Sequence, residues 1–149
     1  MSAVGSWGAA SFENDTASDW FQLLEEAIDP GMVIASALDE ALAEAGHLDL
    51  DLSYAAIAAA ELSASCAGYP PFRLPEGVER WVSTHPHEPH SAEIAAAVEA
   101  VTRVRGESEL RDLWLQTPDS QVGAWLEEVN DLIARLGRSG AGDPATLSP

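Results

Sequence analysis

The sequence predicts an all-α fold, a compact bundle of about six or seven helices with an ordered N-terminal coil. Over most of the chain, apolar residues recur at the three- and four-residue spacing of one helix face. Capping residues, prolines and glycines divide this pattern into segments of helical length. No run alternates apolar and polar side chains with β-branched enrichment, so we expect no sheet.

The first helix is predicted from its caps and its apolar face. Asn14 to Thr16 are good N-cap residues, and Asp19 is placed to complete a capping box with Thr16. Asp29-Pro30 ends this helix, because proline favours the first turn of the next one. The expected inward face consists of Ala17, Trp20, Phe21, Leu24, Ala27 and Ile28.

The second and third helices follow the same logic. The second begins at Pro30 and stops at Gly46, a residue that favours helix ends. Its inward face is expected to be Ile34, Ala37, Leu38, Ala41, Leu42 and Ala45. Asp51 is the expected cap of the third helix, which runs to residue 67. That helix is almost wholly apolar or small, so we expect it to be buried at the centre of the bundle.

Four further predicted helices complete the bundle. We expect helices over 78–84 and 91–105, a short helix capped by Ser108, and a last helix started by Thr117-Pro118. The expected face of the last helix is Val122, Trp125, Leu126, Val129, Leu132, Ile133 and Leu136. The helical domain is therefore predicted over residues 1–137, and the aperiodic segment 138–149 is predicted to be a disordered tail.

The charge is strongly negative and unevenly distributed. The chain has 149 residues with 25 Asp and Glu, 7 Lys and Arg and a formal charge of −18. Residues 1–72 carry 12 acids and no lysine or arginine. Such a surface repels nucleic acid and anionic membranes and attracts a basic protein. Adaptation to solubility or high salt and a cation-linked role remain alternative explanations.

Nothing in the sequence directs the chain to a membrane. The N-terminus lacks a basic start and an apolar stretch long enough for secretion, and no window reaches the roughly 20 apolar residues of a span. We therefore expect a cytoplasmic protein. The single cysteine, Cys66, lies in an alanine-rich run and is expected to behave as a small buried hydrophobe.

Glu61 is the most informative polar residue. It is the only charge between Asp51 and Arg73, in the middle of the apolar third helix. A carboxylate there must be paired or hydrogen-bonded, or its pKa rises. We expect it to hold the N-terminal coil, through the Trp7 indole or backbone N–H groups, or to pair with an arginine such as Arg73 or Arg80. An acid–base or ligand role is the alternative.

Two other polar clusters have a structural and a functional interpretation. Asn14, Asp15 and Asp19 suit the positive end of a helix, and oxygen ligands of this kind also suit Mg²⁺ or Ca²⁺. His85, His87 and His90 have a spacing that permits Zn²⁺ or Ni²⁺ binding. Because prolines hold the histidine segment extended and no second ligand segment is evident, we expect an exposed loop and no metal or other cofactor.

The five tryptophans are mostly expected in the core, with one open to an interface role. Trp7 and Trp20 are the ones nearest the acidic N-terminal cluster. Trp7 begins WGAASFENDTASDW (7–20), which together with AIAAAELSASCAGYP (56–70) and SELRDLW (108–114) resembles a small bacterial family, catalogued as domain of unknown function 4259. A terminal helix containing WLEEVNDLIARL extends the likeness to residue 137. The resemblance implies one helical bacterial domain and brings no activity or catalytic residues.

We expect a non-enzymatic acidic binding protein, acting in the manner of an immunity protein, antitoxin or inhibitor, that docks on a basic protein whose own target is nucleic acid. The sequence has no nucleophile elbow, phosphate-binding loop, zinc motif or di-iron motif. The first alternative is a small metal-dependent hydrolase that uses Glu61 with Asp15 and Asp19. The second is a structural subunit that assembles through an exposed tryptophan. Neither the partner nor the oligomeric state follows from the sequence.

Overall fold

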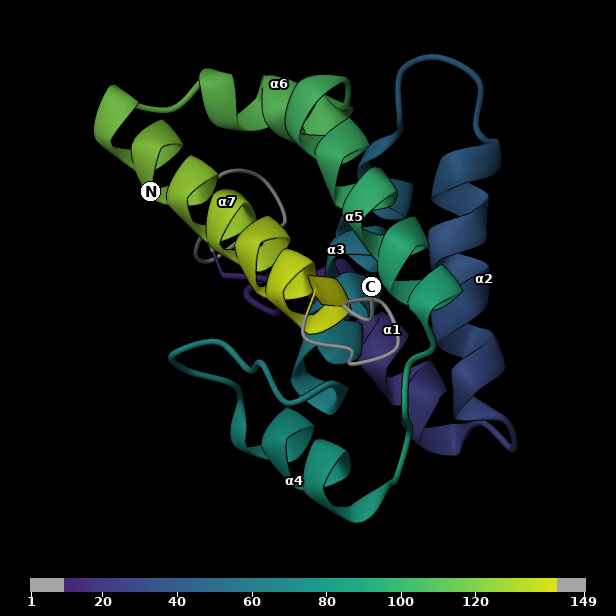
Figure 1. The fold of residues 1–149 in the computed structure, drawn as a ribbon. Helices are drawn as coiled ribbons and strands as arrows, with labels where there is room; N and C mark the ends of the chain where they lie inside the picture. The colour runs from purple at the N-terminus through teal and green to yellow at the C-terminus, as the bar shows by residue number, and fades with distance from the viewer. Residues whose placement is uncertain (1–9, 142–149) are drawn as a thin grey trace.

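Seven α-helices and no strand make up the described part of the chain, residues 10–141, in the computed structural model (Figure 1). They are α1 (Asp15–Glu26), α2 (Pro30–Ala43), α3 (Leu50–Cys66), α4 (Glu76–Thr84), α5 (Ser91–Gly106), α6 (Glu109–Leu115) and α7 (Asp119–Ala141). The predicted all-α bundle is confirmed.

Helix α3 lies at the centre of the bundle and contacts each of the six other helices. Every residue from Ala56 to Ser65 is buried, and most of them are alanine or serine. Small side chains let neighbouring helix backbones approach closely, and the cost of burying the serines is reduced by hydrogen bonds. The predicted central position of this helix is confirmed.

The start of α1 falls within the predicted range, whereas α3 begins earlier than predicted. Asn14 alone caps α1, with its Oδ1 accepting from the Ala17 N–H at 2.7 Å, while Thr16 lies within the helix. The expected capping box of Thr16 with Asp19 was therefore wrong. Asp49, and not Asp51, caps α3 by accepting from the Leu52 N–H at 2.8 Å.

Thr16 and Asp51, the two residues that were predicted as caps and do not act as caps, contact each other. The Thr16 hydroxyl donates to Asp51 Oδ1 at 3.1 Å, which places the first turns of α1 and α3 side by side.

The predicted start of α2 is confirmed, with Asp29 as N-cap and Pro30 in the first turn. Positive φ angles of 77° at Gly46 and 97° at Gly68 follow the ends of α2 and α3, where glycine avoids the steric cost.

The last helix is longer than the sequence pattern indicated. Helix α7 continues through residues 138–141, which were predicted to belong to the tail. A Cβ at Gly140 would lie 3.7 Å from the Ile94 side chain, so this final turn packs on α5. Tertiary contact thus extends the helix despite two glycines. Residues 142–149 lie outside the described part of the chain.

Ile28 and Ala45 were predicted to face inward, and both are exposed. The reason is that α1 ends at Glu26 and α2 at Ala43, so neither residue continues the helical face. Arg103 of α5 donates to the carbonyl oxygens of Ala41 at 2.7 Å and Gly46 at 2.6 Å. These bonds satisfy acceptors at the α2 end that lack helical partners.

Among the described helices, none combines the length and apolar character needed to cross a membrane.

Candidate functional site

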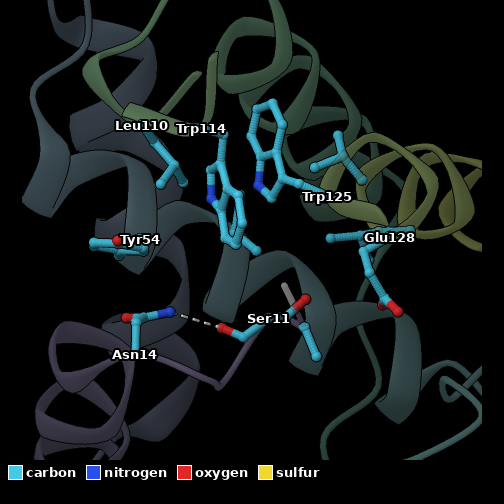
Figure 2. A pocket seen from close by; sticks show the side chains of 11 residues that line it. Ser11, Asn14, Tyr54, Leu110, Trp114, Trp125 and Glu128 are labelled. Atoms are coloured by element: carbon cyan, nitrogen blue, oxygen red, sulfur yellow. Dashed lines mark hydrogen bonds between the residues drawn. The ribbon is translucent and has the colours of Figure 1, made fainter. Parts of the chain in front are cut away.

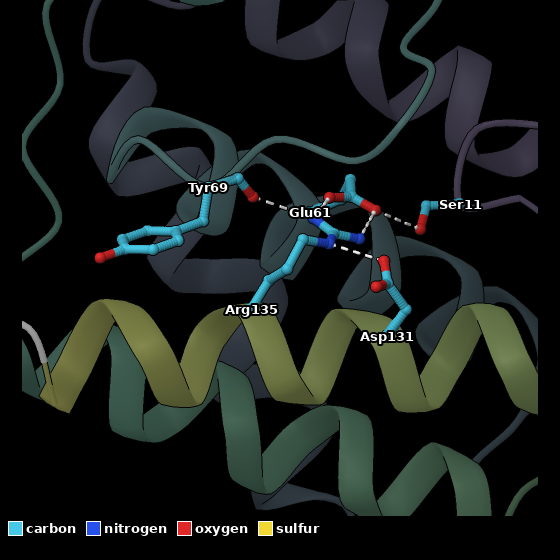
Figure 3. Close-up of polar contacts among 5 residues, drawn as sticks. All are labelled: Ser11, Glu61, Tyr69, Asp131 and Arg135. Carbon is cyan, nitrogen blue, oxygen red and sulfur yellow. Dashed lines mark hydrogen bonds and ion pairs between the residues drawn. The ribbon is translucent and has the colours of Figure 1, made fainter.

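Glu61 lies in the interior, with 2% of its surface exposed, and forms an ion pair with Arg135 of α7 (Figure 3). Arg135 Nη2 donates to Glu61 Oε1 at 3.0 Å, and Nη1 donates to Oε2. This bidentate arrangement is the strong form of a guanidinium–carboxylate contact. The expectation that Glu61 is buried and paired is confirmed, but the partner is neither Arg73 nor Arg80.

The remaining bonds of this pair join two further segments, the N-terminal coil and the residues after α3, and a second acid of α7 (Figure 3). The Ser11 hydroxyl donates to Glu61 Oε1 at 2.9 Å, Arg135 Nη1 donates to the Tyr69 carbonyl at 3.1 Å, and Nε donates to Asp131 Oδ2 at 2.7 Å. A side chain of the N-terminal coil therefore contacts the central helix through Glu61, as predicted. The proposed Trp7 contact lies outside the described residues.

The electrostatics around this pair are dominated by carboxylates. Burial lowers the pKa of Arg135, but hydrogen bonds and attraction from Glu61 and Asp131 outweigh it and raise the pKa overall. The pKa of Glu128 is also raised, first by partial burial and then by repulsion from nearby carboxylates, with Arg135 offsetting a part. The site therefore holds more negative charge than its one buried arginine neutralises.

A groove of about 1010 Å³ opens above the Glu61–Arg135 pair. We call it the proline-loop groove, because one wall is the loop 70–75 with the sequence PPFRLP. The coil 10–13 and α1 form the opposite side, and α7 lines it with Glu127, Glu128, Asp131, Arg135 and Arg138. The volume suits a small molecule or a short peptide segment.

A second, much smaller pocket lies between α3, α6 and α7 (Figure 2). Its volume is about 20 Å³, enough for a single water molecule and too small for a ligand. Trp114 and Trp125 stack beside it with ring centroids 6.4 Å apart. Both tryptophans are buried, as are Trp20 and Trp81, so the four described tryptophans belong to the core and an exposed interface role falls to none of them.

Asn14, Asp15 and Asp19 do not form one site with Glu61. Asn14 is buried as the α1 cap and donates to the Ser11 carbonyl at 3.4 Å (Figure 2). Asp15 and Asp19 are exposed on α1 and do not line the groove that contains Glu61. The carboxylate constellation proposed for a hydrolase is therefore not assembled among the described residues.

The three clustered histidines have three separate roles. His85 stacks on Trp81 with centroids 4.8 Å apart, and His90 caps α5 by accepting from the Glu93 N–H at 3.3 Å. His87 Nε2 lies 3.0 Å from Glu93 Oε1. Residues 10–141 contain no group of three His, Cys, Asp or Glu side chains arranged to hold a metal.

Glu93 is a second buried carboxylate, with 7% exposure, and the sequence analysis missed it. Its Oε2 accepts from the Ser63 hydroxyl at 2.6 Å, and His87 approaches from the α2 side, where a Cβ on Gly31 would lie 3.4 Å from the imidazole. Serine, carboxylate and imidazole occur here in an order that puts the acid in the middle. A serine nucleophile needs the imidazole as its base, so this arrangement is not a catalytic triad.

Cys66 lies one turn beyond Ser63. Burial raises the pKa of its thiol to about 11, and the nearby Glu93 carboxylate adds to the effect. A thiol with so high a pKa carries almost no thiolate near neutral pH and is a poor nucleophile. Cys66 was expected to behave as a small buried hydrophobe; it packs against the core but is only half-buried.

The acids of the front half are mostly exposed. Ten of the twelve in residues 1–72 are exposed, and the exceptions are the half-buried Glu13 and the buried Glu61. Within the described residues, none of these ten forms an ion pair. Their charge is therefore compensated by solvent rather than by arginines of the second half.

Apolar side chains are exposed among these acids where α1 meets α2. Leu23, Ile28 and Met32 have exposures of 63%, 104% and 64%. Glu25, Glu26 and Asp29 lie between them in the sequence and are exposed as well. We call these six residues the α1–α2 corner. It places three exposed apolar side chains and three exposed carboxylates within ten residues of the sequence.

The comparison with protein families identifies the chain at the level of a domain. The family model described as Domain of unknown function (DUF4259) matches residues 5–128. No curated protein and no solved structure matches the chain. The chain belongs to the DUF4259 family.

Proposed function

We propose that this DUF4259 protein is a non-enzymatic binding protein of the bacterial cytoplasm that docks on a basic protein and occludes its working surface. An immunity protein, antitoxin or inhibitor acts in this manner. The proposal goes beyond the family assignment, and it depends on the distribution of charge and apolar surface over the first three helices.

The α1–α2 corner is the observation that carries the proposal. Adaptation to solubility or high salt accounts for exposed acids but not for Leu23, Ile28 and Met32 exposed together among them. Large exposed apolar side chains in one place are characteristic of interaction sites. Apolar contact would supply affinity, and the surrounding carboxylates would select a cationic partner and accelerate its approach.

The buried polar residues support a structural rather than a catalytic interpretation. Both oxygens of Glu61 accept bonds from Arg135 and Oε1 also accepts from Ser11, which supports a role in holding α7 and the coil against α3. Removal of an ion-paired carboxylate from such a position mainly affects stability. The role of the protein is therefore sought on its surface.

The proposal is tested by affinity capture from cells that naturally express the protein, with a matched pair of charge variants. The corner variant carries Glu25→Gln, Glu26→Gln and Asp29→Asn, which keeps an N-cap for α2. The control variant carries Glu99→Gln, Glu107→Gln and Glu109→Gln, three exposed acids of the second half. Both variants lose three negative charges, so only position distinguishes them.

We expect basic proteins to be retained by the wild type and the control and lost from the corner variant. Association with the captured partner should slow by about tenfold or more as salt rises from low to high concentration, because screening weakens long-range attraction. Partners of acidic composition, or equal loss from both variants, would contradict the proposal.

A further inference from the structure

The proline-loop groove has an apolar side formed by exposed and half-buried residues. Phe72, at 99% exposure, stands at the edge of the loop 70–75. Leu74 and the three prolines of the same loop line the groove beside it, as does the buried Phe21 of α1. Proline restricts the loop backbone, so this apolar wall is preformed and loses little conformational freedom when a ligand binds.

The charges along the α7 wall of the groove are sorted by sign. Glu127, Glu128 and Asp131 precede Arg135 and Arg138, and all five line the groove. Arg135 is committed to Glu61 and Asp131, which leaves Glu128 at one end and Arg138 at the other without an ion pair among the described residues. Partial burial raises the pKa of Glu128, and repulsion from the nearby carboxylates of Asp131 and Glu61 adds to this effect.

The distance between the two ends sets the length of a matching ligand. Glu128 and Arg138 are ten residues apart on one helix, which corresponds to about 15 Å at 1.5 Å per residue. An extended peptide covers the same distance in about five residues at 3.3 Å each. The groove is therefore polarised over the length of a short peptide segment.

We infer that the proline-loop groove binds a short extended peptide segment of the partner. An arginine or lysine side chain would lie against Glu128 and Asp131, and a carboxylate about five residues away would lie near Arg138. Phe72 covers the apolar residues between the two charges. Arg73 also lines the groove from the loop and favours the same carboxylate.

This inference rests on the proposed function, since it names the part of a basic partner that enters the protein. The two surfaces share α1. Ser18 and Phe21 line the groove, and the α1–α2 corner begins two residues later at Leu23. One partner would thus contact the corner with its surface and the groove with an extended segment.

The test is an NMR titration of the full ¹⁵N-labelled chain with blocked hexapeptides. The probe has arginine at the first position, aspartate at the sixth and alanine between them. Peptides with arginine at both ends, or aspartate at both ends, are the controls. We expect the mixed-charge peptide to shift amide resonances of residues 72–74, the non-proline residues of the loop, and of residues 128–138, and to bind several-fold more tightly than either control.

Variants assign the effect to the groove. Glu128→Gln and Phe72→Ala should each weaken binding of the probe about fivefold or more, while Glu99→Gln on α5 should leave it unchanged. Both groove residues are exposed, so neither change should unfold the protein. Equal binding of all three peptides, or shifts confined to other parts of the chain, would overturn the inference.

The outcomes for the two surfaces are separable. The corner variant should bind the hexapeptide as well as the wild type does, because its three substitutions lie outside the groove. If the groove variants bind the probe normally while the corner variant loses its partner, the groove inference alone fails. If the probe binds as expected but partner capture ignores the corner, the proposed function fails and a peptide site remains.

Discussion

Glu61 and Glu93 are two buried carboxylates of similar exposure, 2% and 7%, in regions that compensate them differently. Glu61 faces α7 and is bound by a guanidinium that is always charged. Glu93 lies in the first turn of α5 and is bound by the Ser63 hydroxyl and the His87 imidazole. One partner is a permanent cation, and the other is charged only when protonated.

The Glu61 contact is therefore held by a permanent charge, whereas the charge of the partner at Glu93 depends on whether His87 is protonated. The Glu61–Arg135 pair joins α3, α7, the coil and the Tyr69 carbonyl, and its guanidinium keeps its charge at every ordinary pH. The Glu93 cluster joins α3, α5 and the histidine segment with at least one neutral donor. Burial of a carboxylate therefore reveals a structural role only when its partners are known.

The largest expected effect on the free energy of unfolding comes from removing Arg135, the permanently charged partner of Glu61. Arg135→Met leaves Glu61 buried without a cation and should lower the free energy of unfolding by about 3–5 kcal/mol. The double variant Glu61→Leu/Arg135→Met should recover most of this loss, because an apolar pair of similar volume needs no compensation. Urea unfolding followed by circular dichroism measures both.

Arg80→Met is the matched control. Arg80 pairs with Glu76 at 3.2 Å, but both side chains are largely exposed. Its loss should cost under about 0.5 kcal/mol, as for other solvent-exposed pairs. An equal loss in the free energy of unfolding for Arg135→Met and Arg80→Met would show that the buried pair does not stabilise the packing of α3 and α7.

The sequence was sufficient to identify Glu61 but not its partner. A single carboxylate in an apolar helix must be buried and bound, whatever the tertiary arrangement. The partner lies 74 residues away on α7, and helix order in space does not follow from periodicity. The sequence does indicate that Arg135 belongs to a polar cluster, because Glu128, Asp131 and Arg135 follow one another at helical spacing beside the apolar face.

Glu93 illustrates a different limit of prediction. A glutamate in the first turn of a helix is explained by the helix dipole alone, so nothing in its position calls for burial. Likewise, His85, His87 and His90 were grouped by spacing, whereas tertiary contacts give each its own partner. Apolar stripes and caps predict helices well because they are local, and polar pairs across the bundle are not local.

The second prediction concerns Cys66, which reports on the Glu93 region. A thiol pKa of about 11 in the folded protein, against an ordinary value of 9.0, lowers the thiolate fraction at pH 8 by about a hundredfold. Alkylation by iodoacetamide should be slower by this order in the native state than in urea, with a pH–rate inflection near 11. Glu93→Gln should accelerate it by removing the adjacent charge, and equal rates in native and unfolded protein would contradict the assignment.

The smallest expected effect lies beside the permanent pair, at Glu128. A raised pKa in the folded state means that the folded protein binds the proton more tightly than the unfolded chain does. The ionised carboxylate therefore destabilises the fold, and this cost appears as pH rises above the normal value of 4.5 and through the raised pKa. Glu128→Gln should be more stable than the wild type at pH 7 by well under about 1 kcal/mol, because solvent screens an exposed group. The gain should vanish below pH 4.5 in urea unfolding. A variant less stable at pH 7 would mean that Glu128 strengthens the Arg135 contact, and the excess of negative charge at this end of the groove would then be absent.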